Sequence, residues 1–181
     1  MTSAERAHAD LHEQSVGATD EWYTPAYVFE AMGVRFDMDP AAASSPTPSD
    51  GWCDHHDSYD GLIGPWNGFV WLNPPFGRRN GIAPWLGKFR AHRNGIALTP
   101  DRTSAPWWQE AAADMDLLLF VSPKIRFIDS SGRPGTSPAQ GTSLMALGDR
   151  GCAALRTAAS RGLGILCAPA KSLKGTCHEN F

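Results

Sequence analysis

The sequence predicts a single α/β domain whose mostly parallel sheet carries helices on both faces. Apolar runs of strand length alternate with stretches of helical periodicity, an order that favours parallel strands joined by helical crossovers. The chain has 181 residues, of which 42% are apolar and 19% charged, so it can bury one core. We expect the domain to span residues 20–170, between a flexible leader over residues 1–19 and a flexible tail over residues 171–181.

The first predicted elements are a helix and a strand. The helix covers Thr24–Met32, because Thr24 suits the N-cap, Pro25 suits the first helical position and Gly33 suits the helix end. The strand covers Val34–Asp39, where apolar and polar residues alternate.

A buried strand and further helices and strands follow. The uninterrupted apolar run Phe69–Leu72 indicates a strand covered on both faces. Helical spacing marks one buried helix face, formed by Ile82, Trp85, Leu86 and Phe89. The remaining predictions, in chain order, are a strand over Gly95–Thr99, a helix over Ser104–Met115 with Ser104 as N-cap, a strand over Leu117–Val121, a long polar loop over Ser122–Gly141, a strand over Thr142–Leu147, a helix over Cys152–Ser160 and a last strand over Leu163–Ala168.

Composition argues against several classes of protein. No apolar run reaches the roughly 18 residues of a membrane helix, and residues 1–19 lack the apolar stretch of a signal peptide. The net charge of −3 argues against nucleic-acid binding through bulk charge, although local basic patches are compatible with it. The polar residues within 53–57 lack zinc-ligand spacing, so no metal site is predicted. The four scattered cysteines predict free thiols in a reducing cytoplasm: Cys53, Cys152, Cys167 and Cys177.

The strand over Phe69–Leu72 ends at the tetrapeptide Asn73-Pro74-Pro75-Phe76. Neither proline has an N–H for a sheet ladder, so the strand stops and leaves carbonyl oxygens free. In an open α/β sheet, ligands bind at the carboxyl ends of the strands. An amide, free carbonyl groups and an aromatic ring at such a place suit the binding of an exocyclic amino group on a flat ring.

This tetrapeptide and three upstream elements resemble the phage-encoded DNA N6-adenine methyltransferases, the Dam-like family of phages. Asn-Pro-Pro-Phe is similar to the (Asp/Asn/Ser)-Pro-Pro-(Tyr/Phe/Trp) motif of S-adenosylmethionine-dependent amino methyltransferases. Trp22-Tyr23-Thr24-Pro25 resembles the family's Trp-x-Thr-Pro opening, and residues 37–42 resemble its Asp-x-Asp-Pro-x-Ala strand end. Asp60-Gly61-Leu62 and Trp66-Asn67-Gly68 resemble its Asp-Gly-Leu and Trp-x-Gly elements. The resemblance covers roughly residues 20–148.

The resemblance implies an S-adenosylmethionine-dependent enzyme that methylates adenine N6 in DNA on an abridged Rossmann-like methyltransferase sheet. It implies a phage origin, a link to restriction and modification, and work in the host cytoplasm. The implied catalytic residues are Asn73, Pro74, Pro75 and Phe76. The implied cofactor-binding residues are Tyr23, Thr24, Pro25, Asp39, Pro40, Ala41 and Asp60. The expected DNA contacts are Arg78 and Arg79 together with the loop residues Lys124, Arg126 and Arg133.

At most one of Asp37 and Asp39 is expected to face the cofactor, and Asp39 is favoured. The chain departs from the family pattern just beyond this point. Ala41–Ser45 stands where many methyltransferases have a Gly-rich turn, and about 28 residues separate Asp39 from Phe69, too few for two strand–helix units. Three alternatives therefore stay open: methylation of cytosine N4, methylation of a protein glutamine, and a non-catalytic remnant that binds DNA or cofactor.

Overall fold

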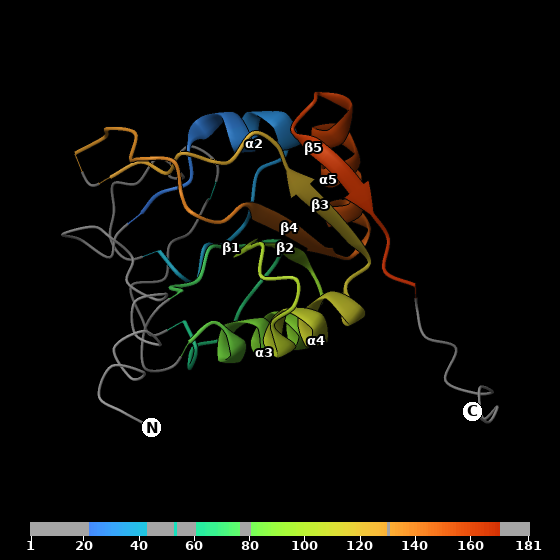
Figure 1. The fold of residues 1–181 in the computed structure, drawn as a ribbon. Coiled ribbons are helices and arrows are strands. Elements are labelled where there is room, and N and C mark those ends of the chain that lie inside the picture. Colours follow the sequence, from blue (N-terminus) through green and yellow to red (C-terminus); the bar gives the residue numbers. More distant parts are fainter. Residues whose placement is uncertain (1–21, 43–52, 54–60, 77–80, 130, 171–181) are drawn as a thin grey trace, which may run out of the picture.

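The computed structural model describes residues 22–42, 53, 61–76, 81–129 and 131–170. With the labels of Figure 1, its elements are α2 (Ala26–Met32), β1 (Val70–Leu72), α3 (Ala83–His92), β2 (Gly95–Pro100), α4 (Pro106–Asp114), β3 (Leu117–Val121), β4 (Thr142–Leu147), α5 (Asp149–Ser160) and β5 (Gly164–Cys167). Each predicted element has a counterpart except the regular strand over Val34–Asp39. There, isolated parallel bridges join Phe36 to Cys53 and Met38 to Val70. The predicted leader and tail lie outside the described residues.

The prediction of a mostly parallel sheet is wrong. Within the described residues the sheet has five strands in the order β1-β2-β4-β3-β5. β1 and β2 pair in parallel, whereas β2 with β4, β4 with β3, and β3 with β5 pair antiparallel. The cause is the connection over residues 122–141, whose described residues form no helix. A parallel neighbour needs a long crossover, usually a helix, whereas a returning loop inserts β4 in the opposite direction.

Three strands nevertheless share one direction. β2 is parallel to β1, and β3 is antiparallel to β4, which is itself antiparallel to β2. The parallel bridge between Met38 and Val70 adds the segment 36–39 to this set. All these chain segments end at one side of the sheet, which we call the carboxyl edge. Asp39 is the last residue of the segment 36–39, and Asn73, Asp101 and Ser122 directly follow β1, β2 and β3 in the sequence.

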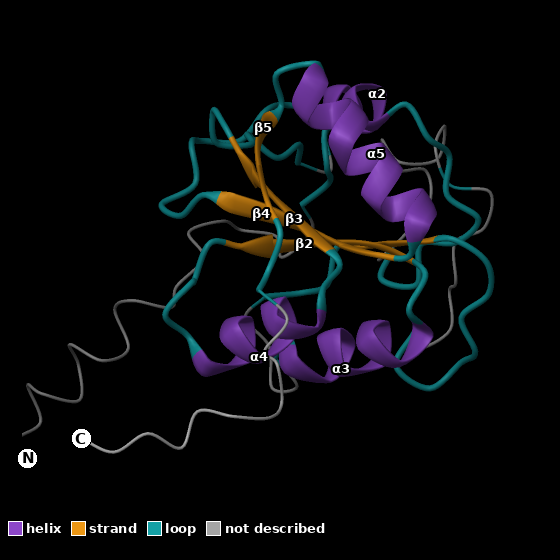
Figure 2. Ribbon diagram, turned by 90° about the vertical axis from the view of Figure 1, so that its right-hand side faces the viewer, coloured by secondary structure: helices purple, strands orange, loops and turns teal. Residues whose placement is uncertain are grey.

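Helices cover both faces of the sheet, as predicted (Figure 2). On one face, α2 and α5 enclose an apolar cluster that includes Phe29, Trp71 and Leu155. On the other face, α3 and α4 enclose a second cluster around Leu72 and Phe89. The sheet is therefore the middle of three layers. Burial on both faces explains why β1 and β4 lack an apolar–polar alternation.

The helix ends differ in part from the prediction. Gly33 ends α2 with a φ of 64°, a left-handed conformation that glycine adopts without strain. Thr24 is not the N-cap, because Pro25 occupies that position in an extended conformation and no side chain caps the helix. The N-cap of α4 is Ala105 and not Ser104, again without a side-chain hydrogen bond.

Aromatic packing joins α2, the segment 36–39 and β1. The Phe36 ring stacks on Phe69, with centroids 4.8 Å apart and 5° between the planes. The Phe29 ring of α2 meets the Trp71 ring edge-on, with centroids 4.8 Å apart. All four side chains are fully buried. This block holds the segment that precedes Asp39 against β1, so it also sets the position of the carboxyl edge.

We expect Phe36→Ala to lower the free energy of unfolding by about 3–5 kcal/mol, because it opens a cavity in this block. Urea unfolding monitored by tryptophan fluorescence measures the change. Ile165→Ala is the control, since Ile165 is 72% exposed on β5 and its truncation should change the free energy of unfolding by less than about 0.5 kcal/mol. Equal effects of the two substitutions would contradict the assignment of Phe36 to the core.

Candidate active site

The tetrapeptide Asn73–Phe76 leaves the sheet at the end of β1. Pro74 is buried, whereas Pro75 and the Phe76 ring are exposed, the latter by 44%. Asn73 is half-buried, and its Nδ2 donates to the Trp22 carbonyl oxygen at 3.4 Å. Within the described part of the chain, Asn73 Oδ1 accepts no hydrogen bond. The amide is therefore held through its nitrogen, and its oxygen stays available as an acceptor.

The segment before α2 is the second component of the edge. Tyr23 forms a two-way backbone pair with Ile128, each N–H donating to the other's carbonyl oxygen at 2.9 Å. Thr24 is 3% exposed, and its Oγ1 is buried and has no hydrogen-bond partner among the described residues. A buried hydroxyl without a partner costs about 1–3 kcal/mol, so such a group marks a place where a bound ligand can add a hydrogen bond.

The end of the segment 36–39 is the third component. Asp39 is 5% exposed, and its Oδ1 accepts the Ala41 N–H at 3.1 Å. Asp37 has a structural role instead, because its Oδ2 accepts the Phe69 N–H at 2.6 Å and lies 3.3 Å from the Arg150 guanidinium. The two carboxylates therefore have different surroundings, although residues two apart in a regular strand share a face; this segment forms isolated bridges instead of a regular strand.

These three components meet at the carboxyl edge. The Trp71 N–H donates to the Met38 carbonyl oxygen at 2.9 Å, which sets the chain leading to Asp39 beside the chain leading to Asn73. The bond from Asn73 to Trp22 brings the start of the Thr24 segment to the same place. The other predicted contacts Asp60, Arg78 and Arg79 lie outside the described residues.

Gly61 is a close neighbour of this edge that sequence reasoning did not single out. It is buried, and a methyl group at its Cα would lie 1.9 Å from the Pro40 carbonyl oxygen. Only glycine permits so close an approach of two backbone segments. Its place in the Asp-Gly-Leu element was the available signal. Trp22 was likewise part of a motif, but its carbonyl contact with Asn73 could not be read from the pattern.

The long loop after β3 forms a compact projection, which we call the finger (residues 127–129 and 131–135). Ile128 and Pro134 form an antiparallel bridge, and the Gly135 N–H donates to the Phe127 carbonyl oxygen at 2.7 Å. The finger packs against the Trp22 ring, because a methyl group at Gly135 would lie only 2.4 Å from Trp22 Cζ3. Together with the Tyr23–Ile128 pair, this contact holds the finger beside the carboxyl edge.

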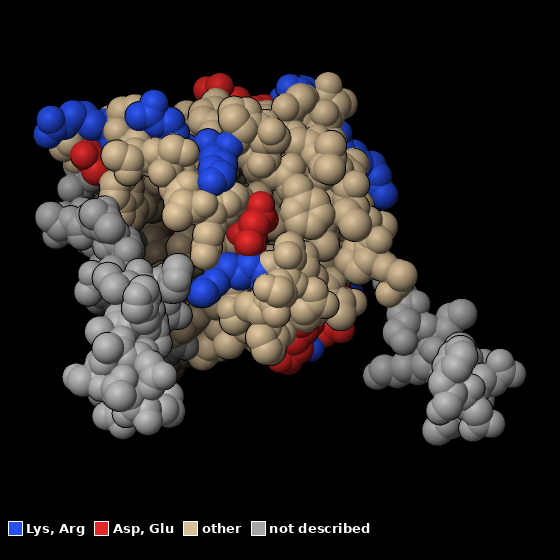
Figure 3. All heavy atoms as spheres, viewed as in Figure 1, with Lys and Arg blue, Asp and Glu red and all other residues tan. Residues whose placement is uncertain are grey.

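The three predicted DNA contacts of this loop are exposed. Lys124 Nζ donates to the carbonyl oxygens of Pro138 and Ala139, at 3.3 and 2.8 Å. Arg126 Nε donates to the Gly135 carbonyl oxygen at 3.1 Å, and Arg133 Nε donates to Ser131 Oγ at 2.9 Å. Figure 3 shows basic atoms at the upper left, where Figure 1 places this loop. The structure thus gathers three cations beside the site.

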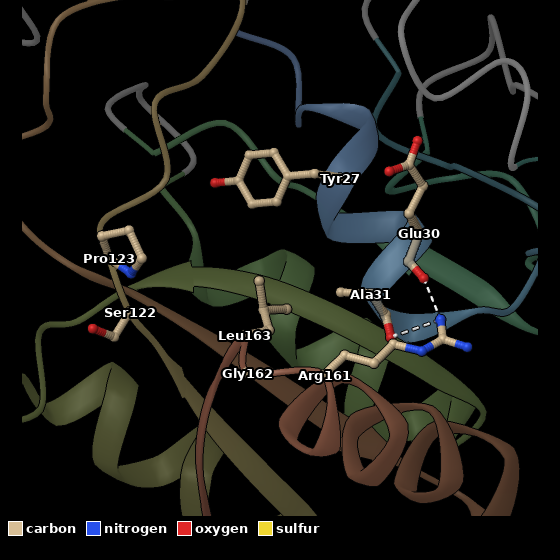
Figure 4. A pocket seen from close by; sticks show the side chains of 8 residues that line it. All are labelled: Tyr27, Glu30, Ala31, Ser122, Pro123, Arg161, Gly162 and Leu163. Carbon is tan, nitrogen blue, oxygen red and sulfur yellow. Dashed lines mark hydrogen bonds between the residues drawn. The ribbon is translucent and has the colours of Figure 1, made fainter.

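A separate hollow of about 400 Å³ lies between α2, the end of β3 and the turn before β5 (Figure 4). Tyr27 contributes an aromatic ring to its lining, and partial burial raises the pKa of this side chain. The guanidinium of Arg161 donates to the carbonyl oxygens of Glu30 and Ala31, at 2.5 and 3.4 Å. Since these bonds hold the last turn of α2, the basic group of the hollow has a structural role. None of the predicted site residues that the structure describes lines the hollow.

The fold defines an α/β protein in which the motif residues Asp39 and Asn73 gather where codirectional chain segments end. The family model for DNA N-6-adenine-methyltransferase (Dam) matches residues 12–156, and the chain belongs to this family. Neither the curated proteins nor the solved structures contain a match to the chain. The protein is therefore a DNA methyltransferase that acts on adenine N6, and the predicted family and activity are confirmed.

Two kinds of feature are absent from the described residues. None of the helices there has the length and apolar character needed to cross a membrane. No group of three or more His, Cys, Asp or Glu side chains in that part of the chain is arranged to hold a metal ion.

Hydrogen bonds to Asp129 predict how the finger responds to pH. The Ser131 hydroxyl and the Arg133 N–H both donate to this carboxylate, which lowers its pKa below the ordinary 3.8. A lowered pKa means that the carboxylate stabilises the finger above pH 3.8 and that this contribution is lost as the pH falls through the lowered value. We expect the amide protons of Ser131 and Arg133 to move to random-coil NMR shifts in that range.

Asp129→Ala should produce the same amide shifts at neutral pH. Asp149→Ala, at an exposed position in α5, is the control and should leave both amides unchanged. Native-like shifts for both amides in the Asp129→Ala variant would contradict the assigned role of this carboxylate.

Proposed function

We propose that S-adenosylmethionine is the methyl donor and that the carboxyl edge holds it. Three observations support a fit: the unpartnered Thr24 hydroxyl, the buried Asp39 carboxylate, and the close backbone approach of Gly61 to Pro40. The residues that would hold the cofactor are Tyr23, Thr24, Pro25, Asp39, Pro40 and Ala41. When bound, S-adenosylmethionine supplies a methyl group already activated by its sulfonium centre.

The observation that carries the proposal is the orientation of the Asn73 amide. Its Nδ2 donates to Trp22, so its Oδ1 can accept one N–H of adenine N6. The Pro74 carbonyl can accept the second N–H, because Pro75 has no N–H with which to extend a ladder. Two acceptors favour a pyramidal nitrogen with a localised lone pair. That lone pair would face the methyl group that bound S-adenosylmethionine would supply, and after the transfer N6 would release one proton to solvent.

The protein's main work in this reaction is alignment of the two reactants. Positioning alone can lower a barrier by up to about 7–11 kcal/mol. The exposed Phe76 ring can stack on the target base, a contact worth about 1–3 kcal/mol. Because N6 is inaccessible inside a duplex, we propose that the target adenine is flipped out of the stack.

We further propose that the loop beside the edge binds DNA. Lys124, Arg126 and Arg133 are exposed and sit on a loop that contacts the site through Tyr23 and Trp22. Cations at such positions bind phosphates and set the orientation of the duplex. The proposed contacts Arg78 and Arg79 follow Phe76 closely in the sequence. A phage origin, a link to restriction and modification, and a cytoplasmic location are proposed from family resemblance.

We expect Asn73→Ala to abolish methylation while changing the dissociation constant of S-adenosylmethionine by less than about threefold, since the amide acts on the base. Nucleoside mass spectrometry of treated, unmethylated plasmid DNA measures N6-methyladenine, and calorimetry measures cofactor binding. Asn67→Ala is the control, because Asn67 is an exposed asparagine before β1. Near-normal turnover by the Asn73→Ala protein would refute the mechanism.

Removal of one phosphate contact should reduce the slope of log affinity against log salt concentration by about one. We expect this change for Arg126→Ala and for Arg133→Ala, measured by fluorescence anisotropy with a DNA duplex. Arg156→Ala is the matched control, because Arg156 is an exposed arginine of α5. An equal loss of slope in the control would show that bulk charge, and not the loop after β3, accounts for the salt dependence.

A further inference from the structure

We infer that Lys88 is a positioning residue for the cofactor site, although it belongs to α3, on the opposite face of the sheet from α2. This inference rests on the proposed function of the carboxyl edge. The observation behind it is a cluster formed by Lys88, Trp66 and the turn that begins at Gly61. This cluster holds the turn in contact with the backbone of Pro40.

The Gly61 carbonyl oxygen accepts two side-chain hydrogen bonds. One comes from Trp66 Nε1 at 2.7 Å and the other from Lys88 Nζ at 2.8 Å. Lys88 Nζ also donates to the Gly64 carbonyl oxygen. Hydrogen bonds from a charged donor are stronger than those between neutral groups. A single ammonium group therefore holds both ends of the turn from Gly61 to Gly64.

Two stacked indole rings lie beside the turn, and the Trp66 ring also lies beside the ammonium group. Lys88 Nζ lies 5.0 Å from the centroid of the Trp66 ring, within the range of a cation–π interaction. Trp66 and Trp85 stack with centroids 6.4 Å apart and are each 8% exposed. A methyl group at Gly61 would approach Trp85 Cζ3 to 3.0 Å, so the turn has no free space on that side.

The turn also fixes the position of the strand end at Asp39, which we propose as part of the cofactor site. A methyl group at Gly61 would lie 1.9 Å from the Pro40 carbonyl oxygen, so the two backbones are in direct contact. Pro40 separates Asp39 from Ala41, and these two residues are joined by a hydrogen bond of 3.1 Å. If the turn moved, the Pro40 carbonyl could rotate and the bend from Asp39 to Ala41 could open.

This arrangement accounts for a departure noted in the sequence. The chain lacks a Gly-rich turn directly after Asp39, where many methyltransferases approach their cofactor. Here one glycine, Gly61, supplies the close backbone approach from another part of the chain. Lys88 and Trp66 hold Gly61 in place through their hydrogen bonds to its carbonyl oxygen. The expected result is a preformed cofactor site whose geometry depends on a side chain that touches neither the cofactor nor the base.

Calorimetry with S-adenosylmethionine and steady-state methylation of plasmid DNA test this inference. We expect Lys88→Met to raise the dissociation constant of the cofactor about tenfold. The turnover number at saturating cofactor should change by less than about twofold, because the reacting groups are intact. Lys88→Arg keeps a charged donor, so it should restore cofactor affinity to within about threefold of the wild type.

Arg90→Met is the matched control on the same helix. Arg90 pairs with Glu110 and Asp114 of α4, away from the turn, so its loss should destabilise the fold without changing cofactor affinity. An unchanged dissociation constant in Lys88→Met, beside a wild type that binds, would overturn the inference and leave the proposed function standing. An equal weakening in Arg90→Met would also overturn it, since the effect would then be general destabilisation. A wild type that does not bind the cofactor would overturn both.

Discussion

The parallel contact between the segment 36–39 and β1 is the constraint on which the site depends. The Asp37 N–H donates to the Phe69 carbonyl oxygen at 2.8 Å, and the Trp71 N–H donates to the Met38 carbonyl oxygen at 2.9 Å. Asp37 adds a third bond through its carboxylate. Because the two chains run in the same direction, both end at one edge. Without this register, Asp39 and Asn73 would not be neighbours.

The site is consequently assembled from all three layers of the domain. The layer of α2 contributes the Thr24 segment, the sheet contributes Asn73, and the layer of α3 holds the turn at Gly61. The finger adds a fourth contribution through Tyr23 and Trp22. Each contact has a backbone group on at least one side, and the position of a backbone group varies little with side-chain motion. Such a scaffold suits an enzyme whose main task is to align a nucleophilic nitrogen with a methyl group.

Much of the fold could be predicted because the signals are local. The apolar run at Phe69–Leu72 and the helical spacing from Ile82 to Phe89 identified β1 and α3. Strand direction is a long-range property, so the antiparallel insertion of β4 was missed, although the helix-free loop Ser122–Gly141 was recognised. The Thr24 hydroxyl was expected to cap α2, but the extended Pro25 occupies that position.

The site residues likewise divide into those with a local sequence signal and those placed by long-range contacts. Motif residues such as Asn73 and Asp39 could be found because their order along the chain is a pattern. Lys88 could not, because it meets Gly61 from 27 positions away through a contact with a backbone oxygen. No spacing rule encodes such a contact, and it becomes visible only when the layers are packed together.

The most direct test of this account is a crystal structure of the protein with S-adenosylmethionine bound. The account predicts that the methionine part of the cofactor lies against Thr24 and the bend from Asp39 to Ala41, with its methyl carbon facing Asn73. A cofactor bound in the hollow beside Tyr27, or with its methyl carbon turned away from Asn73, would contradict the assignment of the carboxyl edge as the active site.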